Sequence, residues 1–280
     1  MEGRLGVRKT YKLFIDGRFP RSESGRTFRY ASRDGVVTVQ LSEASRKDLR
    51  MAVRAARRAY PGWRARSGYN RGQILYRIAE MVEDRAETFI GQLALQATIG
   101  SARREVSEAI DLLIWYAGWC DKYQQVIGNM NPVAGPYFNI STPEPMGVVG
   151  VVAPGQPALL GLVGALAPVM VSGNAAVLLA SSSQAIAAVT FAEAVATADV
   201  PPGVVNILTG SSAELAPWMA GHMDINALDL SGVPPESSPT LEEAASHNLK
   251  RIGRWDASDR NLNRIAAFTE IKTVWHPKGR

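Results

Sequence analysis

The sequence predicts an α/β protein built on a Rossmann-like parallel sheet, with a small antiparallel sheet attached to it. Between residues 147 and 252, short apolar runs alternate with segments of helical periodicity. The runs are nearly continuous in apolar residues, as is typical of parallel strands that helices cover on both faces. Before residue 126 the periodicity is mainly helical. With 280 residues and 46% hydrophobic content, the chain is long enough to bury such a core in one or two domains.

The N-terminal segment is expected to contain a hairpin and then a helix. Residues 11–18 alternate and then turn at Asp16-Gly17, which predicts the hairpin. Ser45 and Asp48 have the spacing of a capping box, which predicts the start of a helix. Pro61-Gly62 is expected to end that helix, whose apolar face consists of Leu49, Val53, Ala56 and Tyr60.

Two further amphipathic helices are predicted over residues 69–96 and 103–126. Cys120, the only cysteine, lies on the apolar stripe of the second one. No neighbouring residue would lower the pKa of its thiol, so we expect a small buried hydrophobe rather than a catalytic thiol.

From residue 135 onward the pattern changes to strands alternating with helices. Two Pro residues near the first strand suggest that it belongs to a hairpin rather than to the parallel sheet. The predicted strands are 136–142, 148–153, 175–180, 204–208, 226–230 and 249–252, and the predicted helices are 157–171, 184–198, 211–220 and 239–246.

The charge is unevenly distributed along the chain. Residues 1–104 carry 22 Lys and Arg against 10 Asp and Glu, whereas residues 105–280 carry 9 against 16. The arginines of the first helix lie between its apolar positions, as on a solvated face, and no nucleic-acid motif accompanies them. We therefore predict no nucleic-acid partner. An acidic protein partner fits the basic half better, and binding of nucleic acid or an acidic ligand is the third alternative.

Several familiar sites are absent from the sequence. It contains no G-x-x-x-x-G-K-[ST], no H-E-x-x-H, no paired cysteine ligands and no G-x-G-x-x-G, and its three histidines are scattered, so no metal site is expected. A single cysteine indicates a reducing compartment. The N-terminus lacks the apolar core of a signal peptide, and the most apolar segment, 159–179, is interrupted by Pro168, Gly173 and Asn174. We expect a cytoplasmic protein without a membrane span.

Several stretches nevertheless resemble one family, in order and at similar spacing over most of residues 11–255. GVVGVVAP, SGNAAVLLASSS, DVPPGVVNILTG, NALDLSG and SHNLKRI resemble the cofactor-binding domain of aldehyde dehydrogenases. AIDLLIWYAGWCDK and STPEPMGVVG are similar to stretches of the same superfamily just before that domain. NRIAAFTEIKTVWHP resembles the C-terminal segment that completes the oligomerisation flap of the family.

The resemblance also implies that the catalytic domain, which supplies the nucleophilic cysteine, is missing. In the family that domain lies between the last two stretches, and here residues 253–262 bridge the gap. The resemblance implies a cofactor-binding domain of residues 1–124 and 147–255, and an oligomerisation flap of residues 125–146 and 256–280. The second, non-catalytic unit of family 16 aldehyde dehydrogenases has a similar architecture.

The same alignment indicates an emptied active site. Gly155 and Gln156 replace Trp-Asn of the A-P-W-N-F-P turn, whose Asn helps to form the oxyanion hole. Residues 179–182 replace K-P-S-E, whose Lys and Glu hold the adenosine ribose, and Val233 replaces the Ser of F-T-G-S. The general-base Glu aligns near Arg254 and Trp255. We expect no catalytic residue and no confident cofactor ligand, only a vestigial cleft of Pro154, Gln156, Leu179, Ser182, Gly232 and Val233.

These features predict a non-catalytic pseudoenzyme that serves as a structural or regulatory subunit. Its expected partner is a full-length aldehyde dehydrogenase, a second copy of this chain, or both, bound through the strand at 268–277. No cofactor is expected. The alternative is a component that binds NAD or NADP weakly within an active dehydrogenase complex.

Overall fold

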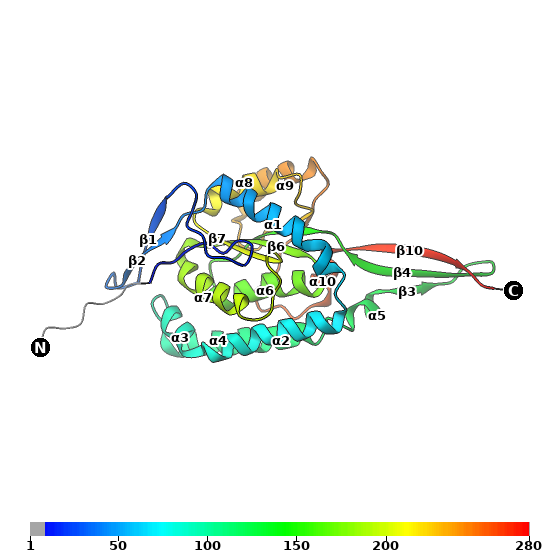
Figure 1. Ribbon diagram of the computed structural model, residues 1–280, viewed down its shortest axis with the longest axis horizontal. Coiled ribbons are helices and arrows are strands. Elements are labelled where there is room, and N and C mark those ends of the chain that lie inside the picture. Colours follow the sequence, from blue (N-terminus) through cyan, green and yellow to red (C-terminus); the bar gives the residue numbers. More distant parts are fainter. Residues whose placement is uncertain (1–8, 280) are drawn as a thin grey trace, which may run out of the picture.

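A five-stranded parallel sheet forms the centre of the protein in the computed structural model, which describes residues 9–279 (Figure 1). Its strands run in the order β7-β6-β5-β8-β9, so the order changes direction at β5, beside which a ligand site is typical of such sheets. The strands are β5 (Val148–Val152), β6 (Ala175–Ala180), β7 (Val205–Thr209), β8 (Ala227–Asp229) and β9 (Arg251–Gly253). The predicted Rossmann-like sheet is confirmed.

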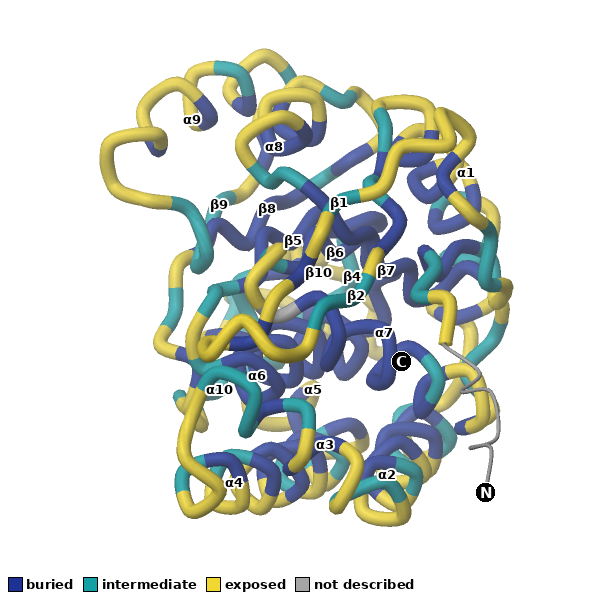
Figure 2. Tube along the Cα trace, turned by 90° about the vertical axis from the view of Figure 1, so that its left-hand side faces the viewer, coloured by how far each residue is buried: buried dark blue, intermediate teal, exposed yellow. Residues whose placement is uncertain are grey.

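Helices cover both faces of the sheet, which explains why its strands are apolar throughout. Every residue of β5, β6 and β7 is buried, and Figure 2 shows this buried interior in dark blue. One face packs against α6 (Ala158–Val171) and α7 (Ala185–Ala196). The other packs against α1 (Arg46–Arg64), α8 (Ser212–Ala220) and α9 (Ser238–Ser246).

A fourth layer of helices lies on α6 and α7 and completes the burial of α6. It consists of α2 (Gly68–Asp84), α3 (Ala86–Leu93) and α4 (Ile99–Ala117), followed by the short α5 (Tyr123–Ile127). All residues of α6 are therefore buried, including Pro168. No helix within residues 9–279 is long and apolar enough to cross a membrane.

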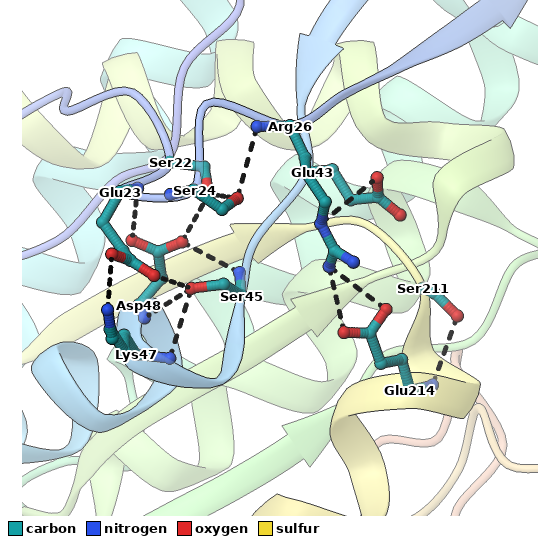
Figure 3. A network of polar contacts seen from close by, with 10 residues as sticks. All are labelled: Ser22, Glu23, Ser24, Arg26, Glu43, Ser45, Lys47, Asp48, Ser211 and Glu214. Carbon is teal, nitrogen blue, oxygen red and sulfur yellow. Dashed lines mark hydrogen bonds and ion pairs between the residues drawn. The ribbon is translucent and has the colours of Figure 1, made fainter.

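The predicted capping box at the start of α1 is confirmed (Figure 3). The Ser45 hydroxyl accepts hydrogen bonds from the backbone N–H groups of Lys47 and Asp48, and the Asp48 carboxylate accepts one from the Ser45 N–H at 2.8 Å. Asp48 is fully buried, and the Ser22 hydroxyl donates to its carboxylate at 2.7 Å. The box therefore also fastens the N-terminal segment to α1.

Three predicted helix boundaries differ from the structure. Helix α1 continues through Pro61 to Arg64, because the fully buried Trp63 anchors its last turn and a proline so near the end disrupts little. The helix predicted over 69–96 divides at Arg85, whose backbone is not helical, so that Phe89 and Leu93 reach the core. The helix predicted over 103–126 divides into α4 and α5.

The early hairpin over residues 11–18 is confirmed as a short one. Asp16 and Gly17 have positive φ angles of 56° and 72°, and Ile15 pairs with Arg18. Before the turn, the Leu13 N–H donates to the Pro20 carbonyl at 3.0 Å, so the hairpin continues, while Phe14 bridges on its other edge to Ile207 of β7. The hairpin formed by β1 (Thr27–Ala31) and β2 (Thr38–Ser42) was not predicted.

The predicted antiparallel sheet is a three-stranded ribbon that projects from the body of the protein (Figure 1). Its strands, in the order β10-β4-β3, are β3 (Asn129–Asn131), β4 (Tyr137–Pro145) and β10 (Thr269–Pro277). The short α10 (Leu262–Ala266) precedes β10, and Ile265 and Phe268 belong to the main core. The ribbon therefore begins at Thr269, and the division of the chain into the two predicted domains stays a prediction.

Candidate functional site

The loops that follow β5, β6 and β8 meet at the carboxyl edge of the sheet, where the candidate site was predicted. Gly155, after β5, lies so close to the β6 loop that an added Cβ would be 3.3 Å from the Ser181 hydroxyl. A Cβ on Gly232, after β8, would be 2.1 Å from the Ala153 carbonyl oxygen, so only glycine fits there. The Gly232 N–H also donates to the Val152 carbonyl at 2.8 Å.

Two of the six residues predicted to form the cleft line a cavity. Gly232 and Val233 lie at the side of a cavity of about 370 Å³ between α8 and α9. Its other lining is mostly small or apolar, including Ala213, Ala216 and Leu241. This lining offers no cationic side chain to a phosphate.

The other four residues lie outside that cavity. Pro154 folds over α6, where an added Cβ on Gly161 would be 2.7 Å from its ring. Gln156 and Ser182 are exposed, Ser182 at the first position of the 3-10 turn Ser182–Gln184. Leu179 is only 2% exposed and belongs to the core beneath α1 and α8. The six residues therefore share one edge of the sheet but not one cavity.

A carboxylate of the protein occupies the N-terminus of α6, where a bound anion would otherwise be favoured. Glu105 of α4 accepts hydrogen bonds from the backbone N–H groups of Leu159 at 2.7 Å and Leu160 at 3.3 Å. Burial raises the pKa of Glu105, and the hydrogen bonds from α6 oppose that rise. One usable signal for Glu105 was its position beside Val106, on the apolar stripe of α4.

A buried ion pair lies next to this edge and was not predicted. The Asp229 carboxylate at the end of β8 is 3.8 Å from the Arg264 guanidinium of α10, and both side chains are at most 1% exposed. Burial raises the pKa of Asp229, while hydrogen bonds from Ser231 and the charge of Arg264 lower it. The Arg264 Nη1 also donates to the Asp256 carbonyl at 2.9 Å, so α10 is fastened to the loop before it.

The connection from β9 to α10 begins with Arg254 and Trp255, the residues that the resemblance places near the family's general base. The Trp255 N–H donates to the Ser231 hydroxyl at 3.0 Å, and the indole lies so close to Gly253 that an added Cβ would be 2.6 Å from its nitrogen. Arg254 points outward to an ion pair with Glu242 at 2.8 Å. The two residues that the resemblance places near the general base are therefore a tryptophan packed on Gly253 and an arginine in a surface ion pair.

Cys120 lies in the core, as predicted. It is 1% exposed, and burial raises the pKa of its thiol to about 12. The reactive form of a cysteine is the thiolate, so this side chain is inert at neutral pH. Within residues 9–279 no group of three or more His, Cys, Asp or Glu side chains is placed to hold a metal ion.

The parallel sheet, its change of direction at β5 and the glycine-containing loops at its carboxyl edge define a Rossmann-like domain of the kind that holds dinucleotides. The chain belongs to the aldehyde dehydrogenase family, whose model matches residues 20–253.

Known relatives agree in fold but are about twice as long. The chain is 31% identical to an aldehyde dehydrogenase of Davidiella tassiana, covering 86% of this chain and 49% of that protein. It is 33% identical to retinal dehydrogenase 2 of Gallus gallus, covering 87% and 48%. A solved aldehyde dehydrogenase from Burkholderia cenocepacia superposes with a TM-score of 0.83 at 29% identity, covering 88% and 50%. The chain thus spans about half the length of the relatives it matches.

Proposed function

We propose that this chain is a non-catalytic member of the aldehyde dehydrogenase family that serves as a structural or regulatory subunit of a cytoplasmic oligomer. A full-length aldehyde dehydrogenase is the preferred partner. The observation that carries the proposal is β10, a strand of nine residues at the edge of the ribbon, whose only strand partner within the described residues is β4. Its Ile271, Val274 and Trp275 side chains are 55–57% exposed. Such an edge is a template for pairing with another chain.

The candidate site supports the absence of catalysis. Aldehyde oxidation by this family's chemistry needs a thiolate that attacks the aldehyde and a carboxylate that activates water. The only thiol is buried in the core, and Arg254 and Trp255 stand at the position of the carboxylate.

We expect the purified chain to reduce neither NAD nor NADP with any simple aldehyde. The matched variant is Cys120→Ser, which removes the only thiol at a buried position with little change in volume. An assembly that contains the chain should keep its activity unchanged in this variant, as measured by nucleotide absorbance. Turnover that disappears in Cys120→Ser would contradict the proposal, whereas turnover by a contaminating enzyme would survive the substitution.

The alternative, an NAD- or NADP-binding component of an active complex, predicts measurable nucleotide affinity. The residues at 179–182 lack the Lys and Glu that hold the ribose in the family. Each lost charge-assisted hydrogen bond costs about 1.5–3 kcal/mol, so affinity should fall by roughly two orders of magnitude or more. Titration calorimetry is expected to show no binding at micromolar NAD. A low-micromolar Kd would favour the alternative.

A further inference from the structure

The free edge of β10 exposes the backbone groups of its odd-numbered residues. The Lys278 N–H donates to the Pro136 carbonyl at 2.7 Å, so this pair continues the ladder between β10 and β4. Residues of an antiparallel strand alternate between bonding one neighbour and the other. Because Lys278 bonds toward β4, the groups of Ile271, Thr273 and Trp275 point away from it, toward solvent.

We propose that β10 pairs antiparallel with β10 of a second copy of this chain, about a two-fold axis at Thr273. This pairing joins two ribbons into one six-stranded sheet. It rests on the proposed function and, of the two partners expected for this strand, assigns the second copy to its free edge, so a full-length dehydrogenase in the same assembly binds another surface. The register follows from the order of side chains along the strand.

The strand is self-complementary in this register. Thr273 lies opposite Thr273 of the partner subunit, Ile271 opposite the partner's Trp275, and Glu270 opposite the partner's His276. Apolar pairs and pairs of opposite charge across neighbouring strands stabilise a sheet, whereas like charges opposite each other destabilise it. All nine residues overlap, and the exposed Ile271 lies beside the partner's exposed Trp275 on one face of the joined sheet.

Neighbouring registers are less favourable. An axis at Lys272 sets Lys272 opposite Lys272 of the partner subunit, and an axis at Val274 sets Lys272 opposite the partner's His276. Both also shorten the overlap by two residues, because the axis leaves the middle of the strand.

The two ends of the strand also fit the proposed ladder. At its start, the Thr269 carbonyl already accepts a hydrogen bond from the Arg251 guanidinium. At its end, Pro277 has no N–H to donate. Between these two ends, the Lys272 ammonium forms an ion pair with Glu144 of its own ribbon at 2.7 Å, so its charge does not oppose a strand that approaches the free edge. The free groups of Ile271, Thr273 and Trp275 are thus the ones the partner strand satisfies.

Disulfide trapping tests the register, on a Cys120→Ser background. Opposed residues of a hydrogen-bonded pair lie about 5.5 Å apart between Cα atoms, within the span of a disulfide. Thr273→Cys should therefore form a covalent dimer in most of the chain under mild oxidation, seen on a non-reducing gel. Ile271→Cys is the matched control, because two copies of it would lie about 13 Å apart. It should stay uncross-linked alone and form a mixed dimer with Trp275→Cys.

Charge reversal provides a second measurement. Glu270→Arg should weaken the dimer roughly tenfold in sedimentation equilibrium, because it disrupts two symmetric pairs, and adding His276→Glu should restore it. Self-linking of Ile271→Cys, or an oligomer in which Thr273→Cys stays unlinked, would overturn this pairing but leave the proposed function standing. If Thr273→Cys links only to a co-purified dehydrogenase, the pairing is also wrong. A chain that is monomeric and partnerless at every concentration would overturn both.

Discussion

Replacing Arg264 by methionine is expected to lower the free energy of unfolding by about 3–5 kcal/mol, because it leaves the buried Asp229 carboxylate without a counter-charge. Both side chains are at most 1% exposed, so solvent does not reach the carboxylate to compensate for the loss. Urea denaturation followed by circular dichroism measures the effect. The matched control is Arg254→Met, which breaks the exposed pair with Glu242 and should cost about 1 kcal/mol or less.

The pH dependence distinguishes lost charge compensation from lost packing. The pKa of Asp229 is already raised by burial, and removing Arg264 raises it further. A carboxyl group whose pKa is raised on folding contributes stability below its unfolded pKa and loses it as the pH rises through the folded one. The loss of unfolding free energy in Arg264→Met should therefore be largest at neutral pH and become smaller as the pH falls toward 4. Asp229→Leu combined with Arg264→Met should recover most of the stability. If the loss of unfolding free energy does not depend on pH and Asp229→Leu does not restore it, then Arg264→Met removed only packing contacts.

Replacing Thr273 by proline is expected to separate the subunits without unfolding the chain. The Thr273 N–H points away from β4, so proline removes an outward donor and obstructs any strand on that edge, while the ladder to β4 keeps its bonds. A proline that clashes with a paired strand costs about 3 kcal/mol or more, so the dissociation constant should rise at least about a hundredfold. Light scattering across a dilution series measures it.

Val274→Pro is the control for that variant. The Val274 N–H points toward β4, so this proline should disrupt the ribbon itself and change the circular dichroism of the chain. If Thr273→Pro assembles as the unchanged chain does, the edge of β10 is not the interface.

Local patterns in the sequence were sufficient to predict the sheet, because the strands of an α/β core are apolar throughout and glycine or proline marks the turns between them. Val148–Val152 and Ala175–Ala180 illustrate this, and each was found to within a residue. The same patterns predicted helix ends incorrectly where tertiary contacts determine those ends. Helix α1 outlasts Pro61 because Trp63 is buried, and the chain divides at Arg85 because Phe89 turns into the core.

The candidate site was predictable only as far as an alignment places residues. Gly232 and Val233 line a cavity as expected, but Leu179 is buried in the core and Gln156 is exposed. Glu105 and Arg264 were missed because their partners are distant in the sequence: Glu105 binds α6 across about fifty residues, and Arg264 reaches back to Asp229. A charged residue beside an apolar stripe does not by itself reveal whether it is solvated or buried against a helix end.

The most direct test of the proposed role is the mass and composition of the assembly that contains this chain. The tagged chain is expressed at its endogenous level in its native host and purified by affinity. Light scattering gives the molar mass and mass spectrometry the partners. We expect an oligomer that persists on dilution, contains a full-length aldehyde dehydrogenase, and owes none of its NAD reduction to this chain. A monodisperse monomer with no co-purifying dehydrogenase would contradict the proposal.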